Sequence, residues 1–366
     1  MPTRVLITGG AGFIGRHLCR ALLRRGYDVR VIDDMVEQVH AGQPLDPVLR
    51  DVELTVGNVR NPDLMAKAVR GMDAVVHLAA EVGVGQSMYE IDRYVGANDL
   101  GTAVLLQALI ASPVRRVVVA SSMSIYGEGL YRAADGTVVE EVIRDLRGGW
   151  DPVDADGNAL VPMPTPEWKR PALASVYAIT KFVQERLVLT VAPAYGMRSV
   201  ALRLFNVYGP GQALSNPYTG VLAIFAARLL NGKPPQVFED GQQRRDLVHV
   251  TDVADAFVRA VEAPDDVCGV FNIGGGKTVT IRELGMQLAA AMGRPKLVPE
   301  ILGKARTGDI RHCVADITLA REQLGFSPRR ALPEGMLELA EWVHRQQAAD
   351  RVGEARRELE QRGLVA

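Results

Sequence analysis

Thr8-Gly9-Gly10-Ala11-Gly12-Phe13-Ile14-Gly15 joins an apolar run, Arg4–Thr8, to a helical pattern that begins at Phe13. Glycines at this spacing let the chain turn tightly, let the backbone approach a pyrophosphate, and let the helix pack on the strand. The amino end of the helix adds N–H groups and a partial positive charge, which attract phosphates. The stretch therefore predicts a dinucleotide-binding βαβ unit with cofactor contacts from Gly9, Gly12, Phe13, Ile14 and Gly15.

Two acidic residues end the next predicted strand, Asp28–Asp33. Asp33 stands where such units place the carboxylate that accepts hydrogen bonds from the adenosine ribose hydroxyls. Asp34 follows it and no arginine occupies this turn, so a 2′-phosphate would be repelled. The pattern favours NAD over NADP as the cofactor. Asp34 taken alone is also consistent with a solvated acid after a strand.

Short β-branched runs alternate with helical patterns through the first third of the chain. The runs are apolar without strict alternation, as in parallel strands that are covered on both faces. The pattern predicts a Rossmann-type, doubly wound parallel sheet in an α/β protein. We expect strands over 4–8, 28–33, 53–56, 74–78 and 114–121, and helices over 13–25, 62–70 and 92–111.

Ligands of open α/β sheets bind at the carboxyl ends of the strands. Asn58 and Val59 follow the third predicted strand, and Leu78-Ala79-Ala80 follow the fourth. We therefore expect all five residues to contact the cofactor. For Asn58, a simple turn-forming role is nearly as good an interpretation.

The alternation of strands and helices is interrupted at Gly127–Pro171, a segment that is rich in proline and turn signals. We expect an extended loop or lid at 127–170 within an NAD-binding domain of residues 1–205 and 248–278. A smaller C-terminal α/β substrate domain would take 206–247 and 279–340. Residues 341–366 would form a helical or frayed tail.

Tyr177 and Lys181 are four residues apart on a predicted helix and so share one of its faces. A nearby ammonium group favours the phenolate and lowers the pKa of a tyrosine toward neutrality. Ser122 and Ser124 lie just beyond the strand that ends near Ser121, at the same edge of the sheet. Together these residues predict proton transfer at a hydroxyl group while hydride moves to a nicotinamide.

Seven motifs along the chain resemble extended short-chain dehydrogenases/reductases of the NAD-dependent nucleotide-sugar epimerase/dehydratase family. They are TGGAGFIG at 8–15, HLAA at 77–80, SSMSIYG at 121–127, YAITK at 177–181, LRLFNVYGP at 202–210, RRDLVHVTDVADA at 244–256 and NIGGG at 272–276. The resemblance implies that Ser122 is the catalytic hydroxyl, Tyr177 the base, and Lys181 its partner and a ribose contact.

The same resemblance assigns the remaining candidate residues and the partners. It implies that Asn98 lies near the cofactor or has a structural role. It also implies that Asn206, Arg245 and Arg306 contact the diphosphate of a dTDP- or UDP-linked sugar, with Ser124 also at the substrate. A homodimer formed by the helices near 92–111 and 175–191 is a further expectation.

The residues after Ser122 bear on the type of reaction. Related dehydratases carry an Asp-Glu pair there, and related decarboxylases a glutamate at position 124, whereas this chain has Met123-Ser124. Neither side chain is a useful acid or base, so we expect a 4-epimerase that passes through a transient 4-keto sugar. Leu214–Phe225 and the 127–170 segment most resemble a bacterial subgroup, the dTDP-L-rhamnose 4-epimerases.

Three alternatives remain open at this point. The sugar can instead be a UDP-hexose or UDP-uronate, the enzyme can be an NAD(P)H-dependent keto-sugar reductase, or the chain can be a non-catalytic NAD-binding protein. Intact Ser122, Tyr177 and Lys181 oppose the last of these.

Composition and charge limit the surroundings in which the protein acts. Of its 366 residues, 48% are hydrophobic and 23% are charged, with a net charge of −1, so no electrostatic attraction to nucleic acid or anionic membrane is expected. The three cysteines are widely spaced and form no C-x-x-C pair, so we expect no metal site and no disulfides. With neither a signal peptide nor an apolar span recognised, we expect a cytoplasmic protein.

Overall fold

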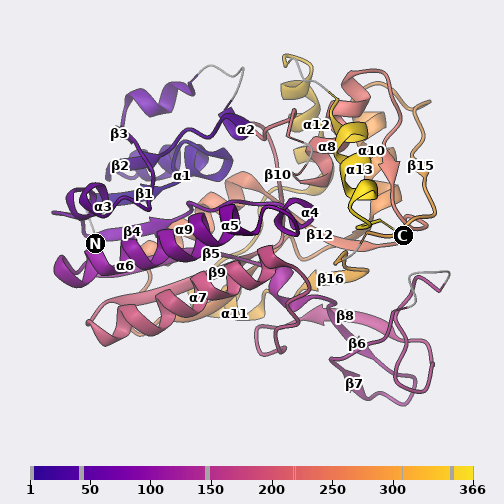
Figure 1. The fold of residues 1–366 in the computed structure, drawn as a ribbon, viewed down its shortest axis with the longest axis horizontal. Coiled ribbons are helices and arrows are strands. Elements are labelled where there is room, and N and C mark those ends of the chain that lie inside the picture. The colour runs from indigo at the N-terminus through magenta and orange to yellow at the C-terminus, as the bar shows by residue number, and fades with distance from the viewer. Residues whose placement is uncertain are drawn as a thin grey trace.

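The computed structural model describes residues 4–40, 45–144, 149–216, 218, 220–306, 308–346 and 350–365. Its main sheet has seven parallel strands in the order β13-β9-β5-β4-β1-β2-β3 (Figure 1). The order reverses between β1 and β4, which is where Rossmann sheets bind ligands. The strands are β1 (Arg4–Thr8), β2 (Asp28–Asp33), β3 (Glu53–Val56), β4 (Ala74–His77), β5 (Arg116–Ser122), β9 (Arg198–Leu204) and β13 (Gly269–Ile273).

Helices cover both faces of this sheet, because its strands are apolar on both sides. One face packs against α1 (Phe13–Leu23), α9 (Val250–Glu262) and α11 (Thr318–Leu324). The other packs against α3 (Pro62–Ala68), α6 (Gly101–Ala111) and α7 (Val176–Ala194). The expected α/β class and doubly wound sheet are confirmed.

Short elements lie in the connections of this first domain. They are α2 (Glu37–His40), the 3₁₀ turn η1 (Pro47–Arg50), α4 (Val84–Ser87), α5 (Ile91–Tyr94), the π-helical turn η2 (Val95–Leu100) and the 3₁₀ turn η3 (Met123–Tyr126). By length and composition alone, the continuous helix Ile91–Ala111 could cross a membrane, with a mean hydropathy of 1.2. It packs against α3 and α7 as a partly buried core helix.

A second, mixed sheet builds the smaller domain, in the order β10-β12-β16-β8-β6-β7, with β14 paired to β12. Its strands are β6 (Leu130–Arg132), β7 (Val138–Val139), β8 (Val161–Thr165), β10 (Asn206–Tyr208), β12 (Arg244–His249), β14 (Thr278–Thr280) and β16 (His312–Ala315). A separate parallel pair joins β11 (Gln236–Val237) to β15 (Glu300–Ile301). The helices are α8 (Val221–Leu230), α10 (Ile281–Ala291), α12 (Leu332–Val343) and α13 (Val352–Gln361).

The 127–170 segment differs from the extended loop or lid that the sequence predicts. It contributes β6, β7 and β8 to the second sheet, where β8 runs parallel to β16. A buried ionic cluster fixes it there: Arg144 binds Glu128 and Glu239, and Arg311 binds Glu239 with an N–O distance of 2.8 Å. The segment is therefore an integral part of the smaller domain over its described residues.

Candidate active site

A cavity of about 630 Å³ lies at the carboxyl ends of β1, β2, β4 and β5 and continues between the main sheet and the second domain. Its Rossmann half is lined by residues that follow those four strands. Its second-domain half is lined by residues around β10, α8, β11 and β12. The volume lies within the usual range for small-molecule sites.

The glycine-rich loop shapes the floor of the Rossmann half. Gly9 has φ of +71°, and a Cβ atom there would stand 2.8 Å from the backbone nitrogen of Ala79. A Cβ at Gly15 would lie 2.5 Å from the backbone of Gly10, so glycine lets α1 pack against the loop. Helix α1 begins after Gly12, and no side chain caps its amino end. The backbone N–H groups there face the cavity and are free to bind an anion.

Asp33 ties the end of β2 to this loop. Its Oδ2 accepts a hydrogen bond from the backbone N–H of Ala11 at 3.0 Å, and its Oδ1 accepts one from Met35 at 2.9 Å. The carboxylate is buried but still lines the cavity. It thus has free acceptor capacity on the cavity side, as a ribose-binding carboxylate requires.

Asp34 and Asn58 line the cavity next to Asp33 and bind each other, with 2.6 Å between the Asn58 amide nitrogen and the Asp34 carboxylate. Asn58 also accepts hydrogen bonds from the backbone N–H and the Nε of Arg60. The two interpretations of Asn58 are compatible, since this residue forms a turn and faces the cavity. Asp33 and Asp34, the two acidic residues at the end of β2, thus remain at the edge of the cavity where a 2′-phosphate would lie.

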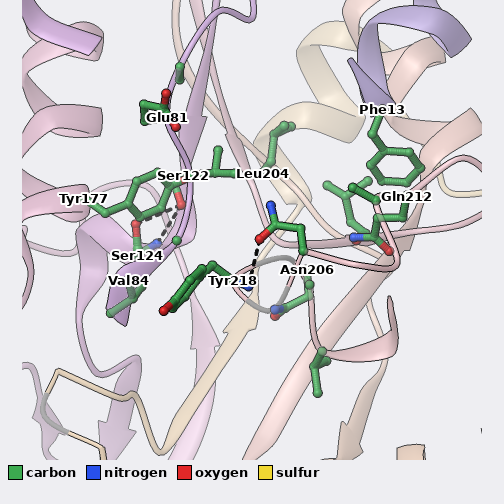
Figure 2. A pocket seen from close by; sticks show the side chains of 18 of the residues that line it. Phe13, Glu81, Val84, Ser122, Ser124, Tyr177, Leu204, Asn206, Gln212 and Tyr218 are labelled. Atoms are coloured by element: carbon green, nitrogen blue, oxygen red, sulfur yellow. Dashed lines mark hydrogen bonds between the residues drawn. The ribbon is translucent and has the colours of Figure 1, made fainter. Parts of the chain in front are cut away.

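Ser122, Ser124 and Tyr177 gather on one side of the cavity (Figure 2). The Ser124 hydroxyl donates to the Ser122 hydroxyl at 2.9 Å, and the Ser124 backbone N–H donates to it at 3.2 Å. Because Ser122 accepts both bonds, its own hydrogen is available to the phenolic oxygen of Tyr177. The arrangement joins a hydroxyl donor to a phenol at the edge of the cavity.

Helix α7 carries Tyr177 and is fixed at several points. Ser175 caps its amino end by accepting from the Ala178 N–H at 3.1 Å, and the Tyr177 N–H donates to the Ser87 hydroxyl at 3.0 Å. Further along, Glu185 forms a buried ion pair with Arg203 of β9, at 2.7 Å. These contacts give the phenol a defined position relative to the sheet.

Lys181 lies one turn beyond Tyr177, at the cavity wall. Its ammonium nitrogen donates to the side-chain oxygen of Gln184 at 2.6 Å. The Gln184 amide nitrogen is in turn 2.9 Å from the Thr102 hydroxyl and 3.2 Å from Nε2 of His77. A buried polar chain therefore orients the lysine, and His77 belongs to that chain rather than to the cavity lining.

The pKa values differ from the expectation that Lys181 lowers the pKa of Tyr177. Burial raises the pKa of the Tyr177 phenol, and its hydrogen bond with Ser122 opposes the rise. Burial also lowers the pKa of Lys181 to about 7, against the pull of Glu185 and Asp99. At neutral pH the lysine therefore carries only part of its charge, and its ammonium bonds to Gln184 instead of the phenol.

The second-domain half contains Asn206, Arg245 and Arg306. Arg245 is held by the carbonyl oxygens of Arg244 and Arg311, and Arg306 binds Asp309 at 3.0 Å. Three buried amide oxygens in this lining lack a hydrogen-bond partner among the described residues; they belong to Asn206, Gln212 and Gln243. The two guanidinium groups suit an anionic group of a ligand, and the three amide oxygens suit its hydroxyl or N–H donors.

Every candidate residue from the sequence lines this cavity except Asn98. Asn98 is fully buried; its amide accepts from the Glu81 N–H at 2.7 Å and donates to the Glu81 carbonyl and the Thr180 hydroxyl. Of the two alternatives that the resemblance left open for Asn98, these contacts favour the structural role, beneath the loop after β4.

Sequence reasoning missed several cavity residues. Phe238 and the residues Val84 and Gly85 of α4 lie in segments without a recognisable motif, and Tyr218 lies in the 214–225 stretch, where the resemblance singled out no individual residue. The inner face of α13 also lines the cavity, although the tail was expected only to be helical or frayed. Conversely, no described residue of 127–170 lines it, and a lid role for this segment stays a prediction.

Within the ranges that the structure describes, no group of three or more His, Cys, Asp or Glu side chains could hold a metal ion.

The family model described as NAD dependent epimerase/dehydratase matches residues 5–145 and 157–274 of the chain. The chain belongs to this family. Its glycine-rich loop, Asp33 and the open amino end of α1 fit the dinucleotide on which the family depends.

Individual members agree with this placement. The dTDP-L-rhamnose 4-epimerase of Burkholderia thailandensis is 34% identical over 93% of this chain and 94% of its own. The UDP-glucose 4-epimerase of Thermotoga maritima, solved with UDP-glucose, has a TM-score of 0.76 and 31% identity over 93% of this chain and 98% of its own. The UDP-glucose 4-epimerase of Thermus thermophilus, solved with NAD, has a TM-score of 0.74 and 30% identity over 94% and 100%.

Proposed function

We propose that this family member is an NAD-dependent nucleotide-sugar 4-epimerase. The observation that carries the proposal is the Ser122–Tyr177 pair at the carboxyl end of β5, followed by Met123-Ser124 instead of an acid–base pair. One phenol that takes and returns a proton is sufficient for inversion at C4. Elimination of water requires further acids and bases, which positions 123 and 124 do not supply.

NAD, when bound in the Rossmann half, supplies the acceptor and later the donor of the hydride. Tyr177 takes the proton of the C4 hydroxyl as the C4–H bond breaks, and Ser122 donates a hydrogen bond to the reacting oxygen. The resulting 4-keto sugar turns its other face toward the same residues. Tyr177 then returns its proton to the C4 oxygen while hydride is restored to C4, so no net oxidation occurs.

Lys181 has two parts in this scheme. Its position one turn from Tyr177 lets it bind the ribose next to the nicotinamide, and its charge favours the phenolate whenever it is protonated. A positive charge on a ligand bound in the site would also favour the phenolate and so lower the pKa of Tyr177. Gln184 is the positioning residue that holds the ammonium group.

For the substrate, we propose a dTDP-linked 6-deoxyhexose of the L-rhamnose type. The support is the 34% identity with the Burkholderia thailandensis enzyme over nearly the whole of both chains. The neutral side chains Val84 and Tyr218 beside Ser124 also suit a methyl group at C6 better than a carboxylate. A UDP-hexose is the second candidate, favoured by the likeness to the Thermotoga maritima enzyme.

We also propose that the enzyme is a cytoplasmic homodimer. Helix Ile91–Ala111 and α7 expose large apolar side chains along neighbouring surfaces, namely Ile91, Val95, Leu100, Ile110 and Ile179. α6 and α7 pack against each other, so these side chains can form one apolar face. A two-fold interface that pairs both helices with their copies would cover it.

The test is to incubate the protein with dTDP-L-rhamnose, UDP-glucose and UDP-glucuronate separately, without added reductant, and to follow the C4 configuration by proton NMR. Inversion of one sugar without a net change in NADH would support the epimerase and identify its substrate. Turnover that appears only with a 4-keto sugar and NAD(P)H would instead establish the reductase.

A further inference from the structure

Helix α13 turns one face toward the cavity. Val352, Ala355, Arg356 and Leu359 follow the spacing i, i+3, i+4 and i+7, and all four line the cavity. Leu364, just beyond the helix, lines it too. Since residues at this spacing share one side of a helix, α13 forms a continuous stretch of the cavity wall. Figure 1 shows the helix against the second domain, near the C-terminal end of the chain.

Contacts with three separate segments hold α13 in this position. Glu358 accepts a hydrogen bond from the Tyr218 hydroxyl at 3.0 Å, and Tyr218 is 2.7 Å from the Tyr89 hydroxyl. The guanidinium group of Arg362 lies over the Tyr89 ring, 4.2 Å from its centre. Beyond the helix, Val365 pairs with Arg306 in a β-bridge. The tail is thus attached to the residues that line the cavity.

Arg356 is the cationic residue on the inner face of α13. Its Nε lies 3.1 Å from Glu360, whose same oxygen atom binds Lys304 at 2.9 Å. Because Lys304 precedes Arg306 by two residues, this contact places Arg356 on the side of the cavity that carries Arg306. The neighbouring Arg357 is exposed on the outer face.

The charges around this wall do not cancel. Arg356 and Lys304 share the single carboxylate of Glu360, and Arg245 and Arg306 share Asp309, at 3.9 Å and 3.0 Å. Each group has two cations for one anion. A wall with this excess suits a ligand that carries more than one negative charge, as a nucleoside diphosphate does.

We propose that α13 closes the outer side of the nucleotide-sugar site and that Arg356 binds the diphosphate there, together with Arg306. The inference rests on the proposed function, because it takes the second-domain half as the site of the sugar nucleotide. It adds a binding residue from the tail, which lies beyond the matched family region that ends at residue 274.

The test compares Arg356→Gln with Arg357→Gln, two identical changes at neighbouring positions of one helix, the first lining the cavity and the second exposed. Calorimetry would measure the binding of dTDP and of UDP to each variant and to the unaltered protein, with NAD binding and the melting temperature as controls for folding. We expect Arg356→Gln to weaken binding of the preferred nucleotide about tenfold, as for loss of one charge-assisted contact, and Arg357→Gln to change it less than twofold.

Equal affinities of the two variants, with the unaltered protein binding a nucleotide, would overturn the role of Arg356 and leave the epimerase proposal standing. Failure of the unaltered protein to bind either nucleotide would overturn both. If Arg356→Gln unfolds the protein, Arg356→Lys provides the second comparison. It keeps the charge but not the forked geometry, and an affinity between those of the Gln variant and the unaltered protein is expected.

Discussion

At the scale of single residues, Tyr177 has an unusual combination of surroundings for a base. Its phenol is packed against protein, which raises its pKa, while the hydrogen bond with Ser122 favours the ionised form. The residue thus depends on its neighbours to ionise. Removing the phenolic oxygen should therefore affect the chemical step, while NAD binding is unchanged.

Tyr177→Phe removes the phenolic oxygen and keeps the ring. We expect epimerase activity to fall by about 10²- to 10⁴-fold, the usual contribution of a positioned acid–base group, with NAD binding unchanged within twofold. Steady-state kinetics and calorimetry would measure the two effects. Tyr195→Phe, at the exposed carboxyl end of the same helix, is the matched control. Activity within tenfold of the unaltered enzyme would remove Tyr177 from the mechanism.

Lys181 offers a pH-dependent prediction about stability. Burial lowers its pKa in the folded protein to about 7, below the ordinary lysine value of 10.5, so the folded state binds fewer protons than the unfolded state between these values. The contribution of this residue to the free energy of unfolding therefore rises with pH from about 7 to 10.5 and is lost below about 7.

The comparison of Lys181→Met with the unaltered protein isolates this contribution. We expect the stability of the unaltered protein, relative to the variant, to increase between pH 7 and pH 9.5. Urea unfolding at both pH values would measure it. If the unfolding curves of the two proteins shift equally between the two pH values, Lys181 titrates normally and the prediction is wrong.

At the scale of elements, the sequence predicts those parts that local patterns determine. β1, β2 and β3 have the expected bounds, because apolar runs and turn residues mark their ends. The strands of the 127–170 segment were not recognised. β8 contains Pro162 and Pro164, and it pairs with β16 about 150 residues further along the chain, so its partner leaves no local signal.

Glu239 tests how this segment is fixed. Its carboxylate is fully buried and binds both Arg144 and Arg311, so Glu239→Ala leaves two guanidinium groups without that partner. We expect a loss of about 3–5 kcal/mol in the free energy of unfolding. Chemical denaturation would measure it, with the exposed Asp135→Ala as the control. A loss below about 1 kcal/mol would mean that the cluster does not hold the segment.

At the scale of the whole molecule, the sequence predicts the Rossmann sheet and most of one cavity, but not what covers that cavity. The motifs reach the cavity from the strand ends, because a parallel sheet gathers its carboxyl ends at one edge. The apolar spacing of Val352, Ala355 and Leu359 is visible in the sequence. Its packing partner is not, since the residues it meets, such as Tyr218 and Gly85, are far away along the chain.

The proposed homodimer gives a prediction at this scale. Leu100 is 52% exposed near the centre of the apolar face, so Leu100→Asp would place a charge within the interface. We expect light scattering to give the mass of a dimer for the unaltered protein and that of a monomer for the variant. Leu337→Asp, on the similarly exposed surface of α12, should remain dimeric. A monomeric unaltered protein would contradict the proposal.

The central claim is that C4 is oxidised and then reduced within one bound sugar. The most direct measurement uses dTDP-L-rhamnose carrying deuterium at C4, with NMR and mass spectrometry of the product. The proposed mechanism predicts an inverted C4 that retains its deuterium, with no net NADH formed or consumed. Product that has exchanged its deuterium for solvent hydrogen, or that forms only with added NADH, would contradict it.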